Sequence, residues 1–419
     1  MKLKFILSAA VLLTTNGLFA QTTPPANPFE VYGNQQSQLI QKAYEARDGE
    51  TGMKLMNEFT VKYNELTPAD KRIYKGFVTN NYYNLSCLYS LINNKPKAFE
   101  YLDSAVNNGY INYSHLMEDT DFANIKNEPK FKQVAQSLRG VADYKYILQK
   151  AEKFNPNDKR VVPAFSYQPA TDPNLVAIRK NFKLDEIAGN GNDASKAINI
   201  LKWVHNTVQH DGQHESGIQL INANEIISKA TSKKIGVSCG ELATTLNECY
   251  LAMGWKSRKV YCFPKDSLNV DYDSHVINVV YLPSLSKWVW MDPTNNAYVM
   301  DENKNLLGIA EVRERIIKNQ PLFVNDDANW NNREKITKEF YLDNYMAKNL
   351  YRVYSPQRNE YNYETRDKDK TITYISLLPL EYFKQSPDKS EDKNKETNFT
   401  IERYRTNNAD AFWKVSAGQ

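Results

Sequence analysis

The sequence has few cysteines, little net charge and few long apolar runs. Four cysteines in 419 residues are too few for a disulfide-stabilised scaffold. The 53 basic and 49 acidic side chains leave a net charge of +4, which argues against a protein dedicated to nucleic acids or other polyanions. After the first twenty residues, no apolar run reaches the roughly eighteen residues that a membrane-spanning helix needs. Hydrophobic residues still make up 41% of the chain, so large cores are possible and the length suggests two or three domains.

The first twenty residues, MKLKFILSAAVLLTTNGLFA, have the pattern of a secretory signal peptide. Lys2 and Lys4 precede an apolar stretch, residues 5–13, that is too short to span a membrane. Ala20 provides a small residue before a cleavage site ahead of Gln21. An uncleaved membrane anchor is the alternative. The pattern predicts an exported protein, periplasmic or secreted, with no membrane span in the mature chain.

Residues 21–141 are predicted to form an α-helical domain, with helices at 35–47, 52–66, 67–93 and 97–106. The segment 82–138 resembles a tetratricopeptide-type helical hairpin followed by its closing segment, 119–131. Tyr83, Leu85, Cys87 and Tyr89 lie in its first helix. An ordinary helical bundle is the alternative.

A second domain is predicted at residues 142–355. Apolar spacing there favours helices at 193–208, 222–233, 237–253, 311–319 and 335–351. Three runs rich in β-branched and aromatic residues predict strands at 257–263, 275–282 and 287–291. Residues 356–419 are predicted to form a strand-prone C-terminal extension whose role the sequence does not indicate.

Cys239 differs from the other cysteines in its local sequence. Ser238 and Glu241 stand in the spacing of a capping box, which places Cys239 in the first turn of a helix. The helix dipole and the unpaired backbone N–H groups there favour a thiolate, and Gly240 allows close approach of a substrate. The other three cysteines lie inside apolar patterns that are typical of buried thiols: Cys87, Cys249 and Cys262.

A nucleophilic thiolate needs an imidazole, and the imidazole needs an orienting carboxylate or amide. His275 begins one predicted strand and Asp292 ends the next. If Tyr281 pairs with Ser286 across the connecting loop, His275 lies directly opposite Asp292. Opposed residues in an antiparallel pair have Cβ atoms about 5 Å apart, which an Asp–His hydrogen bond can bridge.

In residues 195–294 the sequence resembles the transglutaminase-like superfamily, which has a papain-like cysteine fold. The resemblance rests on Cys-Gly-Glu at 239–241, Ala-Met-Gly-Trp-Lys-Ser-Arg-Lys-Val at 252–260, His-Val at 275–276 and Lys-Trp-Val-Trp-Met-Asp-Pro-Thr at 287–294. It implies an α+β core in which the helix carrying the cysteine packs on an antiparallel sheet, preceded here by the α-helical repeat-like domain. The catalytic order Cys, His, Asp then falls on Cys239, His275 and Asp292.

The resemblance also implies an upstream aromatic or amide group that helps to hold the oxyanion. Trp203, Gln209 and Gln213 are the candidates in this sequence, although Trp203 also fits a core position. The backbone N–H of Cys239 is a further oxyanion donor. Gly240, like Trp203 and Gln209, is expected to contact the oxyanion or the substrate.

Other polar residues near these motifs fit simpler roles. His205, His210 and His214 lack the carboxylates or cysteine pair that would complete a metal site, so they are expected around a loop at the cleft. Asp271 and Asp273 give too few oxygen ligands for calcium and are expected at the cleft rim. Arg258 is expected to pair internally, in a structural role. We therefore expect neither a metal nor another cofactor.

These patterns predict an exported thiol enzyme with a Cys-His-Asp triad. It would cleave or transfer a peptide or isopeptide bond through a thioester acyl-enzyme, and hydrolysis is favoured over cross-linking. The expected substrate is a peptide or protein, including cell-wall or glycan-linked forms, and the helical domain is a candidate for binding a protein partner. The alternative is an inactive transglutaminase-like module that binds peptide or glycan.

Overall fold

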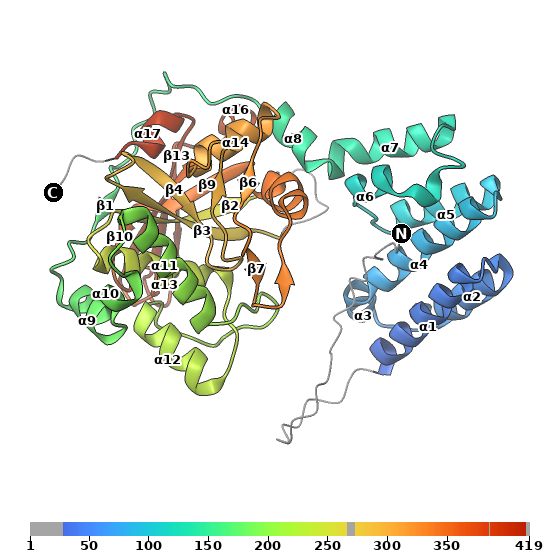
Figure 1. Ribbon diagram of the computed structural model, residues 1–419, viewed down its shortest axis with the longest axis horizontal. Helices are drawn as coiled ribbons and strands as arrows, with labels where there is room; N and C mark the ends of the chain where they lie inside the picture. Colours follow the sequence, from blue (N-terminus) through green and yellow to red (C-terminus); the bar gives the residue numbers. More distant parts are fainter. Residues whose placement is uncertain (1–27, 266–272, 385, 416–419) are drawn as a thin grey trace. The chain divides into compact units, whose positions relative to one another are not determined.

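The structure is a computed structural model that describes residues 28–265, 273–384 and 386–415 (Figure 1). The predicted signal peptide, residues 1–20, lies outside the described part of the chain. Contacts divide the described chain into two units, one formed by residues 28–110 and 119–134 and the other by residues 111–118 and 135–415. In these described segments, no helix is both long enough and apolar enough to cross a membrane.

The first unit is α-helical, as the sequence predicted. Its elements are α1 (Pro28–Glu45), α2 (Gly49–Asn64), α3 (Pro68–Ile73), α4 (Lys75–Leu91), α5 (Lys95–Asn107) and the short η1 (Thr120–Phe122). The helix expected at 67–93 is divided at Tyr74, whose backbone serves as C-cap of α3 and N-cap of α4. Asp48 and Asn94 cap α2 and α5 by accepting hydrogen bonds from Thr51 N and Lys97 N. Short connections make α1 and α2, and then α4 and α5, antiparallel neighbours that pack on each other.

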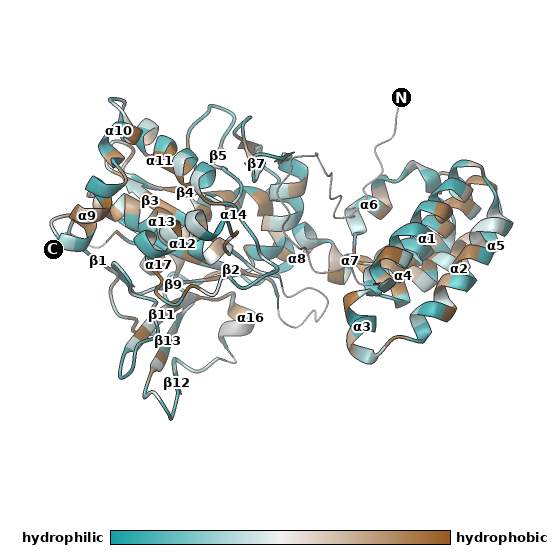
Figure 2. Cartoon of the chain, turned by 90° about the horizontal axis from the view of Figure 1, so that it is seen from below, coloured by the Kyte–Doolittle hydropathy of each residue, from teal (hydrophilic) through white to brown (hydrophobic). Residues whose placement is uncertain are grey.

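The second unit is built on one sheet of seven strands in the order β12-β13-β11-β9-β2-β3-β4. Their bounds are β2 (Ser257–Phe263), β3 (His275–Leu282), β4 (Lys287–Met291), β9 (Arg352–Pro356), β11 (Thr371–Leu377), β12 (Lys389–Lys393) and β13 (Thr400–Thr406). Only the β11–β13 pair within this sheet is parallel. The C-terminal segment expected as an extension thus supplies β11, β12 and β13 to the same sheet as the core strands. Figure 2 shows the edge strand β12 as hydrophilic, and its charged residues protect that edge from further pairing.

Helices and short strands complete the unit. The helices are α6 (Tyr113–Glu118), α7 (Pro129–Ala142), α8 (Tyr144–Lys150), α9 (Pro173–Asn181), α10 (Leu184–Ala188), α11 (Asp193–Thr207), α12 (Ala223–Lys233), α13 (Cys239–Ala252), α14 (Ile309–Ile317), the π-helix η3 (Glu339–Met346), α15 (Ala347–Asn349), α16 (Leu380–Phe383) and α17 (Ala409–Trp413). Helix α7 crosses the boundary between the two units: its residues up to Val134 belong to the first unit, and those from Ala135 belong to the second. The two-residue strands are β1 (Ser166–Tyr167), β5 (Val299–Met300), β6 (Phe323–Val324), β7 (Asn329–Trp330), β8 (Glu334–Lys335) and β10 (Arg358–Asn359).

Both faces of the central strands are buried. Along β4, Trp288 and Trp290 belong to a core that includes α14 and η3, whereas Val289 and Met291 belong to a core that includes α11, α12 and α13. This alternation follows from the two-residue period of a strand. Helix α13 packs directly on β2 and β3. The predicted α+β core, with the helix carrying the cysteine on an antiparallel sheet, is confirmed.

The predicted register between β3 and β4 was wrong by two residues. Tyr281 pairs with Trp288, not with Ser286, and the connecting loop spans the four residues 283–286. Ser286 takes a left-handed conformation, with φ of 52°, which closes this loop. Because side chains in a strand alternate with period two, the shift leaves every side chain on its expected face.

Arg258 has the internal structural role that was expected. It is fully buried, and its guanidinium donates to Tyr167 Oη (2.6 Å) and to the carbonyls of Phe412 (2.6 Å) and Lys414 (2.8 Å). The guanidinium also lies 3.8 Å from the ring centroid of Phe165. These contacts bind the C-terminal helix α17 to the core.

Candidate active site

Cys239 is the first residue of α13, and a complete capping box fixes its position. Glu241 N donates to Ser238 Oγ (3.3 Å), and Ser238 N donates to Glu241 Oε2 (2.7 Å). Ser216, in the loop before α12, also donates to Glu241. The Cys239 thiol is free and only partly buried, whereas Cys87, Cys249 and Cys262 are buried. The sequence therefore places the one cysteine that is not fully buried at a helix N-terminus.

His275 and Asp292 meet at the edge of β3 and β4. His275 Nε2 donates to Asp292 Oδ2 at 2.8 Å, and both side chains are almost completely buried. Asp292 also accepts from Tyr341 Oη (2.5 Å), Asn295 Nδ2 (3.0 Å) and Thr294 N (2.9 Å). Burial opposes the charge of Asp292, but His275, Tyr341 and Asn295 outweigh burial and lower its pKa. The lowered pKa favours the ionised carboxylate, which orients the imidazole.

The π-helix η3 contributes two tyrosines that the sequence did not single out. Tyr341 accepts a hydrogen bond from Trp290 Nε1 (3.1 Å) and donates to Asp292. The ring of Tyr345 packs against that of His275, with 5.2 Å between centroids. π-Helical turns are rare and occur frequently at functional sites. Neither tyrosine belongs to a recognisable motif, because their positions depend on how η3 folds over the sheet.

The imidazoles of His210 and His275 lie beside the thiol of Cys239 and act on its pKa. Burial alone would raise the pKa of this thiol, but the two imidazoles outweigh it and lower the pKa to about 6. Asp292, together with Cys239, raises the pKa of His275 against the opposing effect of burial. At neutral pH the arrangement therefore favours a thiolate–imidazolium pair, and the three residues predicted as a triad are brought together.

His210 is held from several sides beside the thiol. Its backbone N–H donates to Asn331 Oδ1 (2.7 Å), and its carbonyl accepts from Asn331 Nδ2 (2.9 Å). Trp330 Nε1 donates to His210 Nδ1 (3.1 Å). An indole N–H can only donate, so Nδ1 accepts and the ring proton lies on Nε2. The remaining N–H of His210 is thus available to the sulfur of Cys239.

A glycine allows the His210 loop to approach α13. The backbone around His210 pairs with Val237, through Val237 N to Gln209 O (2.9 Å) and Asp211 N to Val237 O (2.8 Å). A Cβ atom on Gly236 would lie only 2.5 Å from Asp211 Cβ. Any side chain at 236 would separate the loop from the start of the helix.

One comparison with known protein families agrees with this geometry. Residues 181–293 match the family profile described as the transglutaminase-like superfamily core. This region is a transglutaminase-like core. No curated protein sequence matches the chain. Among solved structures, a "putative cysteine protease" from Cytophaga hutchinsonii matches at 15% identity with a TM-score of 0.22, over 31% of this chain and 46% of that chain.

The structure gives no particular role in the site to the other residues that were predicted to contact the oxyanion or the substrate. Trp203 packs against Phe182 (5.4 Å between centroids) at the margin of the helical core, as its alternative core position predicted. The side chain of Gln209 is exposed, whereas its neighbour His210 contacts the thiol. Gln213 is also exposed. A Cβ on Gly240 would meet nothing nearer than 3.7 Å, so no protein contact requires glycine there.

The three upstream histidines have three different environments. His205 is buried and bonds to Pro293 O (3.0 Å) and Asn329 Oδ1 (2.9 Å), which ties α11 to the segment after Asp292. His214 is exposed and pairs with Asp211 (2.8 Å). Asp273, expected at the rim, pairs with Lys348 (3.3 Å), whereas Asp271 lies outside the described residues. Among the described residues, these histidines form no cluster with metal-ligand spacing.

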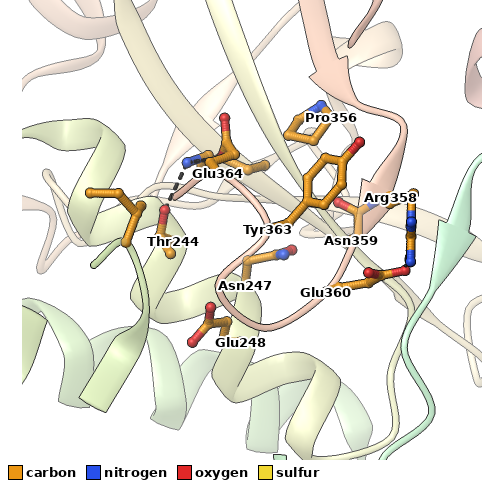
Figure 3. A pocket seen from close by; sticks show the side chains of 11 residues that line it. Thr244, Asn247, Glu248, Pro356, Arg358, Asn359, Glu360, Tyr363 and Glu364 are labelled. Carbon is orange, nitrogen blue, oxygen red and sulfur yellow. Dashed lines mark hydrogen bonds and ion pairs between the residues drawn. The ribbon is translucent and has the colours of Figure 1, made fainter. Parts of the chain in front are cut away.

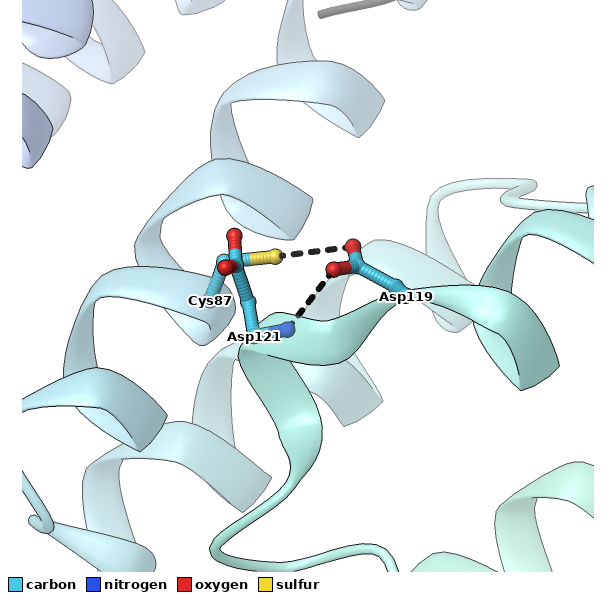
Figure 4. A group of neighbouring side chains, drawn as sticks. All are labelled: Cys87, Asp119 and Asp121. Atoms are coloured by element: carbon cyan, nitrogen blue, oxygen red, sulfur yellow. Dashed lines mark hydrogen bonds between the residues drawn. The ribbon is translucent and has the colours of Figure 1, made fainter. Parts of the chain in front are cut away.

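Within the described chain, one group has ligand atoms close enough to hold a metal: Cys87, Asp119 and Asp121 in the helical unit (Figure 4). Their atoms already serve as hydrogen-bond partners. Asp119 Oδ2 accepts from Tyr83 Oη (2.8 Å) and from the Cys87 thiol (3.6 Å), and Asp121 accepts from Tyr44 Oη (2.5 Å). Burial raises the pKa of Cys87 well above its usual value, which opposes the thiolate that a metal needs. The group fits a structural network better than a metal site.

A small polar pocket lies beside α13, between this helix and the segment after β9 (Figure 3). Glu248 lines it and is 1% exposed, and its carboxylate accepts from Ala223 N (2.7 Å) and Asn362 N (2.9 Å). Burial is the main reason that its pKa is raised to about 8. Lys259, which lines the same pocket, donates to Thr244 Oγ1 (2.7 Å) and pairs with Glu364. Glu248 thus joins the nucleophile's helix to the segment after β9.

Proposed function

We propose that the protein is a cysteine-dependent enzyme that hydrolyses an amide bond. The observation that carries the proposal is the partly exposed Cys239 at a helix N-terminus, whose thiol pKa is lowered by two imidazoles, one of which is oriented by Asp292. Cysteine nucleophiles are activated by this combination of a nearby imidazole and a helix dipole. The transglutaminase-like core is consistent with a thiol enzyme.

The reaction would proceed through a thioester. The Cys239 thiolate attacks the carbonyl carbon, and the C–N bond breaks as His275 transfers a proton to the leaving amine. Since Nε2 of His275 is bound to Asp292, Nδ1 is the atom that serves the thiol and the amine. Water then attacks the thioester and gives its proton to His275, which releases a carboxylic acid and restores the thiol. An amine acceptor in place of water would give transfer, but an aqueous compartment favours hydrolysis.

We assign the oxyanion of the tetrahedral intermediate to two donors, the backbone N–H of Cys239 and Nε2–H of His210. Trp330 fixes the His210 tautomer that donates from Nε2. A preorganised donor of this kind contributes roughly 10²–10³-fold to the rate in hydrolases. His210 would thus take the role that was expected of Trp203 or Gln209.

The test is mass spectrometry after incubation with pools of peptides, cell-wall fragments and amines. Wild-type protein should deplete specific amides and release the matching acid and amine, and Cys239→Ala should not. Cys249→Ala is the matched control, because Cys249 lies in the same helix but is buried. Equal turnover by Cys239→Ala would refute the thiol mechanism and favour the binding-module alternative.

We further propose that the enzyme is exported and acts on peptide or protein amides outside the cytoplasm, including cell-wall or glycan-linked ones. The support is the signal-peptide pattern of residues 1–20. Intact-mass measurement of protein from its native host should find a chain that begins at or near Gln21. A mature chain that retains Lys2 would contradict export by cleavage.

A further inference from the structure

We propose that Phe340 and Tyr345 form a subsite for an aromatic side chain on the leaving-amine part of the substrate. We call these two rings the aromatic shelf. The inference rests on the proposed thiol mechanism and extends it to substrate selection. The π-helix η3 carries both rings, and the ring of Tyr345 packs against the imidazole of His275.

The π-helix η3 is what places the two rings together. Phe340 and Tyr345 are five residues apart, and in an α-helix such residues point about 140° away from each other, because each residue turns the chain by about 100°. A π-helix bonds residue i to residue i+5, which brings these positions onto one face. Their rings are parallel to within 3°, with centroids 6.3 Å apart.

The aromatic shelf leads from solvent to His275. Phe340 is 57% exposed, which is uncommon for a large apolar side chain that stacks on an ordered neighbour. Tyr345 lies between Phe340 and the imidazole, and its ring is also covered by the Lys348 ammonium at 5.1 Å. Tyr345 is thus held in place, while Phe340 presents its ring to solvent.

The position of the shelf indicates which part of the substrate it contacts. The acyl group is bound to the sulfur of Cys239, and the oxyanion is directed to His210. The leaving nitrogen must come within about 3 Å of the His275 ring to receive its proton. The substituent on that nitrogen therefore passes the His275 side of the site, where Tyr345 and Phe340 lie. Offset stacking of an aromatic side chain on these rings stabilises such a substituent.

The experiment needs no knowledge of the natural substrate, because an incoming amine occupies the place of the leaving amine. p-Nitrophenyl acetate acetylates the Cys239 thiolate and releases p-nitrophenolate. An added amino acid amide then attacks the thioester, its proton passes to His275, and the products are an N-acetyl amide and the free thiol. We measure the ratio of interception by phenylalaninamide and by glycinamide, normalised to the p-nitrophenolate burst.

In the wild type, phenylalaninamide should intercept the acetyl-enzyme about tenfold more efficiently than glycinamide, since an aromatic contact of this kind discriminates by roughly that factor. Phe340→Ala should reduce the ratio to about threefold or less. Phe323→Ala is the matched control, because Phe323 is a similarly exposed ring, at 49%, on β6. Tyr345→Phe retains the ring and should retain the preference.

The possible outcomes distinguish a failure of the aromatic shelf from a failure of the proposed thiol mechanism. A burst with equal interception by both amides would overturn the aromatic shelf and leave the thiol mechanism intact. A preference that survives Phe340→Ala would overturn it as well. The absence of any burst that depends on Cys239 would overturn the proposed function, and the shelf with it.

Discussion

His275 Nε2 lies 2.8 Å from Asp292 Oδ2, although the two residues do not face each other in the sheet. His275 pairs with Cys262 on β2, and extension of the β3–β4 register would set Asp292 opposite Ile277. Asp292 is therefore a diagonal neighbour of His275 on the same face, at a distance that long side chains can bridge. Because this bond uses Nε2, Nδ1 is left for Cys239.

The pKa of Cys239 leads to a prediction about alkylation. Since the thiolate is the reactive form and the pKa is lowered to about 6, the rate should rise through half its maximum near pH 6. An ordinary thiol would reach that point near pH 8.5. The three buried cysteines should react far more slowly, because burial raises their pKa values. Peptide mapping after brief iodoacetamide treatment at several pH values measures this.

His210→Gln tests, in the same alkylation experiment, whether His210 helps to lower the pKa of Cys239. It removes one of the two imidazoles beside the sulfur, so the midpoint should move to higher pH. His214→Gln is the control, because His214 is exposed and pairs with Asp211. If all four cysteines label equally, or if the midpoint of the wild type lies above pH 8, the thiolate assignment is wrong.

Tyr341 is predicted to act as a positioning residue for Asp292. Tyr341→Phe removes the hydroxyl that donates to Asp292 and accepts from Trp290, and should reduce turnover by about tenfold. Asp292→Asn weakens stabilisation of the imidazolium and should cost about 10–100-fold, whereas Cys239→Ala should reduce turnover to background.

The pH–rate profile distinguishes positioning from general damage in Tyr341→Phe. Loss of the Tyr341 bond should raise the pKa of Asp292, so the activity lost in Tyr341→Phe should be greatest at the lowest pH, where Asp292 takes up a proton. A uniform loss at every pH, together with a lowered melting temperature, would instead indicate a merely structural role.

The sequence predicted the elements of the active site better than their contacts. The capping box placed Cys239 correctly, because the signal lies within four consecutive residues. The β3–β4 register was wrong because loop length depends on turn geometry, yet the two-residue error preserved the face of Asp292. The contact of His210 with Cys239 depends on pairing between segments near 210 and 237 and on Trp330, none of which local periodicity reveals. The π-helix was expected as an ordinary helix, because spacing alone does not distinguish the two.

Arg258 should matter for stability and not for the thiol. Arg258→Met leaves the carbonyls of Phe412 and Lys414 and the Tyr167 hydroxyl without their donor in the core, so we expect a loss of about 2–4 kcal/mol in the free energy of unfolding. Arg179→Met breaks an exposed pair with Asp185 and should cost about 1 kcal/mol or less. Urea denaturation measures both, and similar losses in the two variants would contradict the assigned role of Arg258.

The raised pKa of Glu248 should make the free energy of unfolding fall as pH rises. Its pKa is about 8 in the folded protein and near 4.5 when unfolded, so between these values the folded state binds more protons than the unfolded state. Linkage then lowers the free energy of unfolding as pH rises from about 4.5 to 8. Glu248→Gln should reduce this slope, even though the amide cannot accept both backbone hydrogen bonds. Equal slopes in wild type and variant, by urea denaturation at pH 5 and pH 8, would contradict the prediction.

Acid-quenched mass spectrometry after exposure to p-nitrophenyl acetate at pH 7 tests the central claim most directly, because it detects the covalent intermediate. The account predicts one acetyl group, on the peptide that contains Cys239, labile to neutral hydroxylamine as a thioester is, and absent from Cys239→Ala. Acetylation of lysine or tyrosine alone, or the same acetylation in wild type and Cys239→Ala, would contradict it.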